Sequence, residues 1–585
     1  MRIKLLEKLT LLLFSSLILI LGYNQILKGP YYSRLSRNNR IKLVRLAAER
    51  GSIYDRYGKV LADTKLIFNA SILPQEVTNI QQVINKISPV LGISSGKLLR
   101  EYKKNRLAPF IPVVIAPDIS KETAIILECE ESDIPGLIIE AKSQRNYPGN
   151  KSLSHILGYM GKISEEELPK EKTYGSQLQN KLTGKSGLEN FFEQYLKGED
   201  GGMQIEVNNR GHFVQVLGER PAKKGQDIYL TIDSQLQKYI EQLLEEHKGV
   251  CIVMNPNNGQ ILSMVSKPDF DPNLFIAATN GKLEAQNILQ KILNSKDAPL
   301  LDRAVSASFA PGSIFKIIVG CAGLESGKIS VTDKIFCPGS LEVGNRKFFC
   351  WKHDGHGEEN IHTAIAHSCN VFFYTLGLSL GADKISSFAR KFTLGQPAGI
   401  ELPYENPGLV PSRSWKLQKK KAPWYTGDTA NFAIGQGYVL TTPLQMAKMV
   451  SAIANGGTLI HPHLVTKIGE KPCPLSEPER LAFKKTTLQA IREGMRQAVQ
   501  REDGTAHKAE IADVQWAAKT GTAQTSSEST HAWFTGFYPF ETPSIVVLVF
   551  LEEGGSGGHF PALIARQIVE YIRTKDITGD NLENF

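Results

Sequence analysis

The chain has 585 residues, of which 42% are hydrophobic and 22% charged, with 50 Gly and 29 Pro. At about 150 residues per domain this length predicts several domains, and the composition excludes a collagen-like, a fully disordered and a multi-pass membrane protein. The net charge of +9 is small for the length, and basic runs are not interleaved with aromatic residues, so nucleic acid is not an expected partner.

The first feature in chain order is an uncharged, mostly apolar run from residue 9 to residue 27. At about 1.5 Å per residue, a helix over this run can cross the hydrocarbon layer of a membrane once. A cleaved signal peptide is the alternative, but Gly22–Gln25 lacks the small-x-small pattern of a cleavage site. We therefore expect residues 1–28 to form a short cytoplasmic tail and a single transmembrane helix. Basic residues flank both ends of the run, so charge alone does not fix its orientation.

The next region, residues 29–235, alternates short helical and strand-like pieces and shows no pattern typical of catalysis. Its last part contains two predicted strands, 204–208 and 227–233, and a helical pattern begins at Ser234. The change of pattern predicts a domain boundary at residue 235. A second domain then covers 236–575, followed by a tail at 576–585.

The second domain opens with a predicted hairpin, because 249–254 and 259–266 read as strands joined by an Asn-Pro-Asn-Asn turn. A run of three lysines at 419–421 is interpreted as a solvated loop rather than as a binding patch. Further strands and a closing amphipathic helix are predicted at 517–522, 532–538, 545–551 and 561–573. These elements indicate an α/β domain built around a sheet.

A serine and a lysine three residues apart, Ser313 and Lys316, stand at the start of a predicted helix. At this spacing the two side chains share one helix face, so a neutral amine can take the serine proton. The backbone N–H of Ser313 is a free donor of the first turn and can point at an oxyanion. The pair alone is a weak signal, because Ser94 and Lys97 repeat it and a capping serine near a surface lysine explains a lone match.

Two further motifs follow in order, Ser368-Cys-Asn370 and Lys519-Thr-Gly-Thr522. Each one alone is explained by a polar loop or by a bend in an edge strand. The ordered set of Ser-x-x-Lys, Ser-x-Asn and Lys-Thr-Gly is the pattern of acyl-serine transferases. The set therefore predicts an enzyme with Ser313 as a nucleophile.

Additional segments extend this pattern over nearly the whole chain. In the first domain they are Arg50–Ala62, Arg145–Pro148, His155–Tyr159, Gly184–Glu189 and Leu230–Gln237. In the second domain they are Trp424–Thr429, Gly435–Gly437, Thr442–Gln445 and His531–Phe534. With these segments the chain resembles the class B penicillin-binding proteins, and the Trp424 and His531 segments resemble the elongation type rather than the division type.

The resemblance implies a fold of three parts: a membrane anchor, an elongated and mostly β pedestal of the dimerisation type, and a penicillin-binding domain. That last domain has a central antiparallel sheet flanked by helices. The implied activity is a D,D-transpeptidase that cross-links peptidoglycan stem peptides during lateral cell-wall elongation. It would work through an acyl-enzyme on Ser313 and would be inhibited by β-lactams, with no cofactor needed for catalysis.

The family pattern also assigns roles to the catalytic motifs. Ser313 attacks the penultimate D-Ala carbonyl, and neutral Lys316 is the base, its pKa lowered by burial and by nearby Lys519. Ser368 relays the proton to the leaving D-Ala amine. Asn370 holds both Lys316 and a substrate amide.

The strand motif is assigned to substrate binding in the same way. Lys519, Thr520 and Thr522 meet the terminal carboxylate of the donor peptide, and Gly521 leaves room for that peptide. The oxyanion lies between the backbone N–H groups of Ser313 and Thr522.

Cys337, Cys350, His356 and Cys369 fall where some elongation-type relatives have a zinc site. All four are zinc-ligand types, and four protein ligands would make the metal structural rather than catalytic. The alternative is a disulfide between Cys337 and Cys350, with Cys369 buried and His356 at the surface. The other cysteines, expected to be ordinary core or surface residues, are Cys129, Cys251, Cys321 and Cys473.

Other functions remain as alternatives. They are a division-type class B enzyme, a serine β-lactamase or carboxypeptidase, and a β-lactam sensor or silent scaffold. The anchor and pedestal disfavour a secreted β-lactamase, and the intact motifs disfavour a silent scaffold. The resemblance further implies a single-pass protein of the inner membrane with a periplasmic catalytic domain. Its implied partners are a glycan polymerase of the shape, elongation and division class and a rod-shape scaffold protein.

Overall fold

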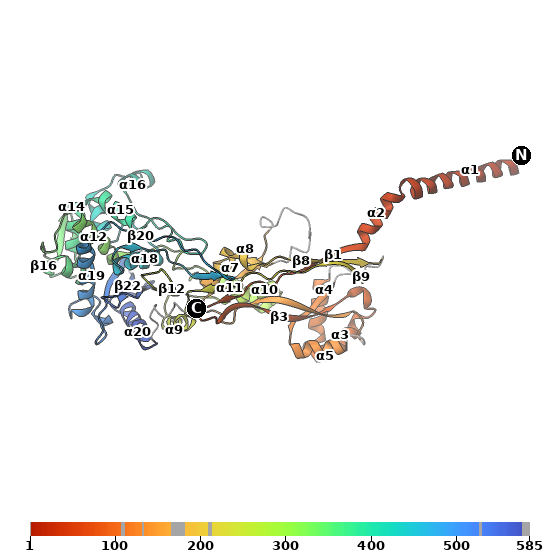
Figure 1. The fold of residues 1–585 in the computed structure, drawn as a ribbon, viewed down its shortest axis with the longest axis horizontal. Helices are drawn as coiled ribbons and strands as arrows, with labels where there is room; N and C mark the ends of the chain where they lie inside the picture. Colours follow the sequence, from red (N-terminus) through yellow and green to blue (C-terminus); the bar gives the residue numbers. More distant parts are fainter. Residues whose placement is uncertain are drawn as a thin grey trace.

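The computed structural model describes residues 2–106, 112–130, 134–164, 182–208, 213–525 and 529–575. The molecule is elongated, with the N-terminal helix at one end and most helices of the second domain at the other (Figure 1). The tail predicted at 576–585 lies outside the described residues.

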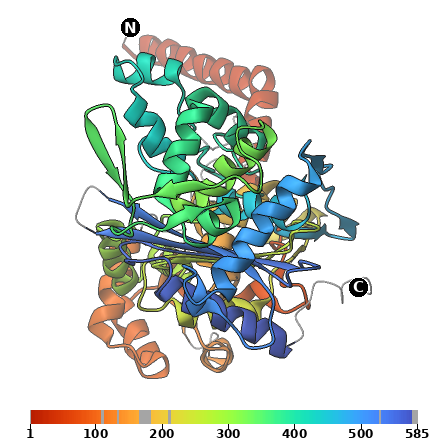
Figure 2. The same ribbon diagram turned by 90° about the vertical axis from the view of Figure 1, so that its left-hand side faces the viewer.

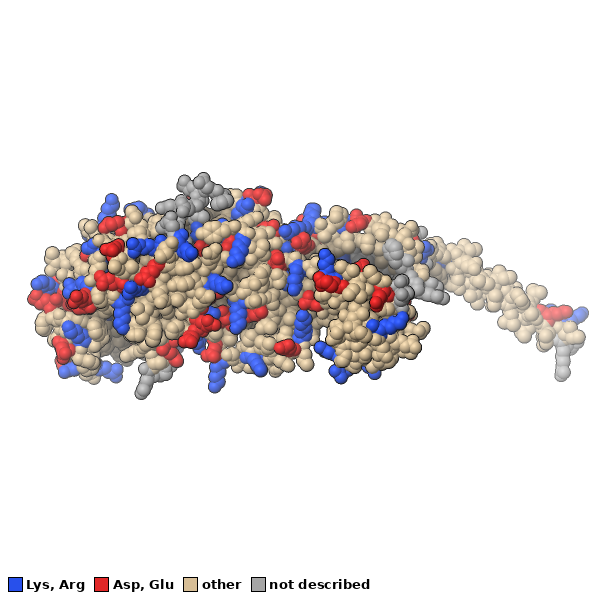
Figure 3. Space-filling view, turned by 90° about the horizontal axis from the view of Figure 1, so that it is seen from below, with Lys and Arg blue, Asp and Glu red and all other residues tan. Residues whose placement is uncertain are grey.

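The N-terminal segment is a continuous helical rod made of α1 (Arg2–Gly22), the π-helix η1 (Tyr23–Leu27) and α2 (Gly29–Arg40). Residues Ile3–Leu27 have a mean hydropathy of 2.0 and none of their surface is buried in the protein. In the space-filling view the rod is nearly free of charged side chains, whereas positive and negative side chains are interspersed over the rest of the visible face (Figure 3). These features support a single-pass membrane anchor.

The described part of the pedestal contains two main sheets and the two-stranded β6-β7 pair. The smaller main sheet is antiparallel, in the order β1 (Ile41–Leu46), β8 (Gly201–Val207) and β9 (Phe213–Arg220). The larger follows the order β19-β18-β10-β2-β3-β4, and β5 also pairs with β3. Its strands are β2 (Ile53–Tyr54), β3 (Val60–Ile72), β4 (Val113–Ile119), β5 (Leu137–Asn146), β10 (Ile228–Leu230), β18 (Val465–Ile468) and β19 (Lys471–Pro472).

Three helices cover one end of the larger sheet: α3 (Ile80–Leu91), α4 (Ser95–Asn105) and α5 (Lys121–Cys129). Their apolar faces join the β3, β4 and β5 side chains in one hydrophobic cluster. The second Ser-x-x-Lys match lies here, and both Ser94 and Lys97 are exposed. This match is therefore a helix start with a surface lysine.

The rest of the pedestal consists of short elements, which surround a buried ion cluster. The Glu189 carboxylate lies 2.6 Å from Arg50 Nε and 2.6 Å from Arg145 Nε. The elements are η2 (Pro74–Glu76), α6 (Ser154–Leu157), β6 (Met160–Lys162), β7 (Leu182–Gly184), α7 (Gly187–Phe191) and α8 (Glu193–Leu196).

The two domains share a sheet. Strand β10, just before the predicted boundary at residue 235, pairs in parallel with β2 of the pedestal and antiparallel with β18 of the second domain. The register places Ile228 opposite both Ile53 and Ile468. The pedestal and the second domain are thus joined by backbone hydrogen bonds as well as by the chain itself.

The second domain is built on a five-stranded antiparallel sheet in the order β12-β11-β23-β22-β21. All residues of β11 and β23 are buried, as expected for central strands covered on both faces. The predicted hairpin and the three later strands are confirmed. The bounds are β11 (Gly249–Met254), β12 (Ile261–Lys267), β21 (Ala517–Gln524), β22 (Thr530–Tyr538) and β23 (Ile545–Leu551).

Helices cover both faces of this sheet (Figure 2). Because side chains alternate along a strand, Val250 and Ile252 face one hydrophobic cluster and Cys251 and Val253 the other. The first cluster includes α18 (Pro443–Ala454), and the second includes α9 (Ser234–Leu243) and α20 (Phe560–Lys575). The predicted closing helix is therefore confirmed as α20.

The remaining elements of the second domain surround the catalytic motifs. The helices are α10 (Asn273–Thr279), α11 (Leu283–Leu293), η6 (Gly312–Phe315), α12 (Lys316–Glu325), α13 (Ile361–Ala366), α14 (Asn370–Leu380), α15 (Ala382–Lys391), α16 (Arg413–Lys420), α17 (Thr426–Ala433), α19 (Lys485–Gln500) and η7 (His507–Ala509). The strands are β13 (Ile335–Cys337), β14 (Ser340–Val343), β15 (Arg346–Phe349), β16 (Gly357–Glu359), β17 (Thr458–Leu459) and β20 (Glu479–Arg480).

The prediction of a loop at residues 419–421 is wrong, although all three lysines are exposed as expected. Lys419 and Lys420 form the last turn of α16, and Lys421 ends the helix in the left-handed conformation. Ser412 caps the start of this helix through the backbone N–H of Trp415, at 3.1 Å. Lysines at a helix C-terminus are favoured by the helix dipole, which explains the helix over this stretch.

Candidate active site

Ser313 lies on η6, a 3-10 turn that continues directly into α12. The preceding residue, Gly312, has φ +54° and donates its N–H to the carbonyl of Gly435 at 3.0 Å. A Cβ atom on Gly312 would lie 2.7 Å from the carbonyl oxygen of Thr522. Glycine at this position therefore lets the backbone before Ser313 lie directly against Thr522 of β21.

Lys316 points into the protein from the first turn of α12 and is fully buried. Its Nζ donates to Asn370 Oδ1 at 2.6 Å and to the Ser368 carbonyl at 2.8 Å, and it lies 3.3 Å from Ser368 Oγ. The structure thus brings together the first two motifs. One amine connects them.

The electrostatics of the site suit a neutral amine. Burial lowers the pKa of Lys316 to about 8, partly opposed by the nearby thiols of Cys369 and Cys350. Burial also holds the pKa of Lys519 well below its usual value, and the charge of Lys316 adds to this effect. At pH 7 roughly a tenth of Lys316 is therefore neutral and ready to accept a proton, far more than for an exposed lysine.

The Ser-x-Asn segment connects α13 to α14. Ser368 has φ +52°, a left-handed conformation that costs a serine roughly 1–3 kcal/mol and turns the chain sharply between the two helices. Cys369 then caps α14, whose first residue is Asn370. The Asn370 amide nitrogen donates to the carbonyl of Phe349 at 3.2 Å, so the side chain is fixed at both ends.

The third motif lies on β21, at the edge of the sheet. Side chains alternate along a strand, so Lys519 and Gly521 share one face and Thr520 and Thr522 the other. The structure therefore does not place Lys519 and the two threonines on a common face, as the expected carboxylate site implied. A Cβ on Gly521 would lie 3.2 Å from Ile314, so this glycine lets η6 approach the strand.

Two contacts near the nucleophile were not assigned from the sequence. Gln436 Nε2 donates to the Thr522 carbonyl at 3.3 Å, and Trp533 Nε1 donates to the Ala310 carbonyl at 3.1 Å. Gly435 has φ +74°, and a Cβ there would collide with the carbonyl of Gly312. The segments holding Gly435, Gln436 and Trp533 resembled the family pattern, but nothing in the sequence showed that they fix the position of η6 against β21.

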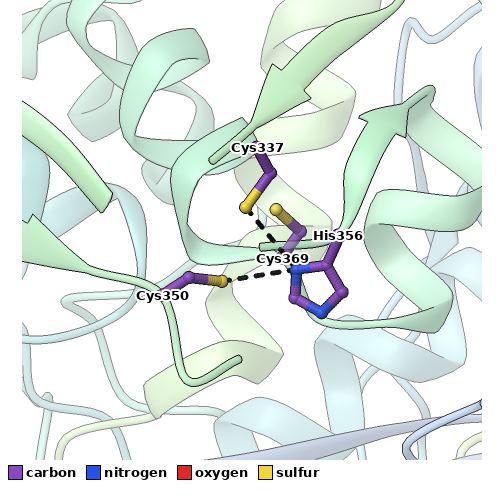
Figure 4. A group of neighbouring side chains, drawn as sticks. All are labelled: Cys337, Cys350, His356 and Cys369. Carbon is purple, nitrogen blue, oxygen red and sulfur yellow. Dashed lines mark hydrogen bonds between the residues drawn. The ribbon is translucent and has the colours of Figure 1, made fainter. Parts of the chain in front are cut away.

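The four residues expected as zinc ligands or as a disulfide lie together beside the Ser-x-Asn turn (Figure 4). Their ligand atoms are all within 4.8 Å of one another. Nδ1 of His356 lies 3.6 Å from Cys337 Sγ and 3.5 Å from Cys350 Sγ. None of the seven cysteines, all within the described residues, forms a disulfide.

A second group of charged side chains supports this turn. His367 Nδ1 lies 2.7 Å from the buried Glu359 carboxylate, and its other ring nitrogen lies 3.1 Å from Asp503. Its ring stacks on that of His356 with the centroids 5.5 Å apart. Trp351 Nε1 donates to the His367 carbonyl at 2.9 Å. Glu359, His367 and Asp503 were not identified from the sequence, because they belong to no motif.

Comparison with known proteins accounts for both domains. The family model for the penicillin binding protein transpeptidase domain matches residues 249–570, and that for the penicillin-binding protein dimerisation domain matches residues 45–230. The chain is 33% identical to the peptidoglycan D,D-transpeptidase MrdA of Haemophilus influenzae, over 94% of this chain and 87% of that protein.

Solved structures give the same result. The penicillin-binding protein PBP2 of Helicobacter pylori, in a complex with MreC, has a TM-score of 0.80 and 31% identity, covering 92% of this chain and 99% of that chain. A chain from a peptidoglycan synthase complex that coordinates polymerization and crosslinking has a TM-score of 0.75 and 30% identity, covering 100% of this chain and 99% of that chain.

Proposed function

The chain belongs to the class B penicillin-binding proteins of the elongation type, and we propose that it cross-links peptidoglycan stem peptides as a D,D-transpeptidase inactivated by β-lactams. The observation that carries the proposal is Lys316. Its amine is fully buried, and it is held by Ser368 and Asn370 one helical turn from Ser313. A buried lysine beside a serine at a helix start is the arrangement needed to activate that serine.

Acylation begins with Ser313. Its Oγ attacks the carbonyl carbon of the penultimate D-Ala while neutral Lys316 accepts the hydroxyl proton. When the tetrahedral intermediate collapses, the C–N bond breaks and the proton passes from Lys316 through Ser368 Oγ to the departing D-Ala amine. The amine of an acceptor peptide then attacks the ester. The new peptide bond forms as Ser313 leaves and regains its proton.

Binding of the donor peptide uses the edge of β21. The oxyanion accepts hydrogen bonds from the backbone N–H groups of Ser313 and Thr522, which the close packing of Gly312 on Thr522 supports. The hydroxyls of Thr520 and Thr522, which share one face of β21, hold the terminal carboxylate, and Lys519 on the other face acts through its charge alone. With its amide nitrogen bonded to Phe349, Asn370 acts mainly by holding Lys316.

The proposal is tested by labelling the full-length protein in detergent with a fluorescent penicillin. We expect Ser313→Ala to abolish labelling, because no other described serine lies three residues before a buried lysine. Ser94→Ala is the matched control, since it removes the serine of the other Ser-x-x-Lys match and should label normally. Labelling that persists in Ser313→Ala contradicts the proposal, and so does an adduct that hydrolyses within seconds, which is typical of a β-lactamase.

The Cys337, Cys350, His356 and Cys369 cluster is proposed to hold a structural Zn²⁺. Three thiols and an imidazole are a common tetrahedral zinc set, and they converge here from β13, the loops after β15 and before β16, and the start of α14. A hydrogen bond from Cys369 lowers the pKa of Cys350, so one thiol of the cluster ionises readily, as a metal ligand must. A bound zinc would tie the loops after β13 and β15 to the segment that positions Ser368.

Metal analysis of the protein purified without chelator tests this. We expect about one zinc per chain, and Cys350→Ser should lose most of it, whereas the exposed Cys129→Ser should retain it. Protein without zinc whose mass reveals a Cys337–Cys350 disulfide would contradict the zinc site and support the alternative pairing.

The surroundings of the enzyme are proposed from its relatives. An inner-membrane protein with α1 as its anchor and a periplasmic catalytic domain places Ser313 where cell-wall peptides are. The similarity to a PBP2 solved with MreC and to a chain of a peptidoglycan synthase complex supports a rod-shape scaffold and a glycan polymerase as partners. Co-purification of the full-length protein with each partner, from membranes of cells that produce both, tests these contacts.

A further inference from the structure

A second hollow lies on the second domain, against the outer face of α19, which is turned toward the viewer in Figure 2. Its volume is about 770 Å³, and the catalytic residues described above do not line it. Its charged and aromatic lining consists of His362, Arg480, Lys485, Arg492, Arg496 and Phe540, together with two carboxylates, Glu493 and Glu541, so positive charge is in excess. The hollow therefore joins α13, α19, β20 and the end of β22 in a site separate from Ser313.

Arg492 is the central cation of this hollow. It is half-buried, its guanidinium lies over the rings of Phe537 and Phe540 at 5.3 and 5.2 Å, and one nitrogen donates to the Phe540 carbonyl. Among the described residues no carboxylate lies within ion-pair distance of it; burial lowers its pKa, and the longer-range charge of Glu541, which also lines the hollow, opposes this effect only in part. A half-buried guanidinium without an anion retains free donors in a place where a ligand anion would be strongly held.

Two more buried nitrogen atoms on the wall lack a hydrogen-bond partner among the described residues. They are Arg496 Nε and His362 Nε2. Arg496 is paired with Glu493 at 2.9 Å through another nitrogen and also stacks on Phe540, so its orientation is fixed while Nε stays unused. Buried polar atoms without partners are costly in a folded protein. A bound ligand with acceptor oxygens would satisfy Arg496 Nε, and His362 Nε2 in the tautomer that carries its proton on that atom.

The walls also limit the class of ligand. Val331, Leu488 and Phe540 supply apolar surface, and the rim residues Arg480 and Lys485 add exposed positive charge. The volume is in the range that holds a small organic ligand, so a single inorganic anion would fill little of it. A short peptide with carboxylates and small apolar side chains fits the forked guanidinium, the apolar walls and the size together.

We propose that this hollow is a second, non-catalytic site that binds a carboxylate-bearing stem peptide of peptidoglycan. The choice of peptide rests on the proposed function, because that activity makes stem peptides the anionic ligands this domain meets. The peptide carboxylate pairs with Arg492 and lies within reach of the unused nitrogens of Arg496 and His362. The site holds one peptidoglycan strand against the domain by its stem peptide, while Ser313 reacts with the stem peptide of another strand.

The test is calorimetric titration of the full-length protein in detergent with a synthetic stem tetrapeptide that carries two carboxylates. Ser313 is first acylated with benzylpenicillin, so the catalytic cleft is blocked and only other sites are measured. We expect saturable binding to one site. Arg492→Gln should weaken it by about tenfold or more, because it removes a charged hydrogen-bond donor. Arg492→Lys should be intermediate, since it keeps the charge and loses the fork.

Controls separate this proposal from folding and from the catalytic function. Arg566→Gln, on the exposed side of α20, should leave binding unchanged. Each variant must still be acylated by penicillin, which shows that it is folded. Acylation also tests the assignment of Ser313 independently of the titration. If Arg492→Gln does not fold, Lys485→Gln at the exposed rim replaces it and should weaken binding in the same direction. Absence of binding, equal binding by all variants, or complete displacement of the peptide by an equal concentration of inorganic phosphate would overturn the proposal.

Discussion

In the proposed mechanism, catalysis at Ser313 depends on the protonation state of Lys316. The amine is surrounded by protein, with the ring of Phe373 5.6 Å away, and burial is the main cause of its lowered pKa. Lys519 was expected to lower the pKa of Lys316. In the structure the effect is instead on Lys519: the charge of Lys316 lowers the pKa of the equally buried Lys519.

The pH dependence of acylation follows from this state. The reactive form of Lys316 is the neutral amine, and its pKa is about 8. The second-order rate of acylation by a fluorescent penicillin should therefore fall by roughly tenfold per pH unit well below the pKa and level off above it. Stopped-flow labelling across this range measures it. A rate that stays constant from about pH 6 to pH 9 would show that Lys316 is not the titrating base.

The candidate catalytic residues could be proposed from the sequence because each motif is short and the motifs are ordered in the chain. Helix spacing alone places Ser313 and Lys316 one turn apart. The bond from Lys316 to Asn370 does not, because it depends on how α12 packs against α14. Glu359 and His367 were missed for the same reason: their role arises from contacts with the turn at Ser368.

At the scale of elements, prediction succeeded where one local signal dominates. Strands β11 and β23 are continuous apolar runs and were found nearly residue by residue. The α16 turn at Lys419 was missed because a run of lysines was interpreted by its charge, while the Ser412 cap and the helix dipole favour a helix. The pairing of β18 with β10 joins distant parts of the chain and has no local signal.

The contact between α14 and α17 gives a prediction at this scale. A Cβ on Gly377 of α14 would collide with that of Ala433 on α17, close to Gly435 and the nucleophile. Gly377→Ala should therefore lower the free energy of unfolding by about 1–3 kcal/mol through overpacking and slow the acylation of Ser313. Thermal unfolding and penicillin labelling of the same preparation measure both effects.

Gly96→Ala on α4 is the matched control for this substitution. A Cβ there meets no atom within 4 Å, so only the better helix propensity of alanine acts. We expect its stability to be equal or slightly higher. If Gly377→Ala unfolds at the same temperature as the control, α14 and α17 are not in the tight contact that positions Gly435.

At the scale of the whole molecule, the fold holds the second domain at a distance from its anchor on an elongated pedestal (Figure 1). The pedestal has a hydrophobic cluster of its own among β3–β5 and α3–α5, and directed contacts add rigidity between that cluster and the second domain. The shared strand β10 supplies one set, reinforced where Tyr229 stacks between Tyr54 and Lys467 across the β2-β10-β18 ladder, at 5.0 and 4.4 Å. The buried Glu189 cluster supplies another. Neither was foreseen, because both join segments far apart in the chain.

The Glu189 cluster gives the last prediction. Burial alone would raise the pKa of Glu189, but the guanidinium groups of Arg145 and Arg50 outweigh it and lower the pKa. Glu189→Gln leaves these two buried cations without their common anion, which should cost about 3–5 kcal/mol of unfolding free energy. Glu193→Gln is the control: its carboxylate is more exposed, and it pairs with one guanidinium, that of Arg50, and accepts the Gly184 N–H, which a glutamine can also do, so about 1 kcal/mol is expected.

Chemical unfolding of the full-length protein in detergent, followed separately by intrinsic fluorescence and by penicillin acylation, measures both variants. The lowered pKa of Glu189 means that its carboxylate stabilises the folded protein at pH values above the usual glutamate pKa. This stabilisation is lost as the pH falls through the lowered pKa. The difference in unfolding free energy between wild type and Glu189→Gln should therefore disappear in acid. If the pedestal and the catalytic domain are one mechanical unit, acylation is lost together with the fluorescence signal. A Glu189→Gln protein as stable as the Glu193→Gln control would mean that the cluster does not hold the pedestal together.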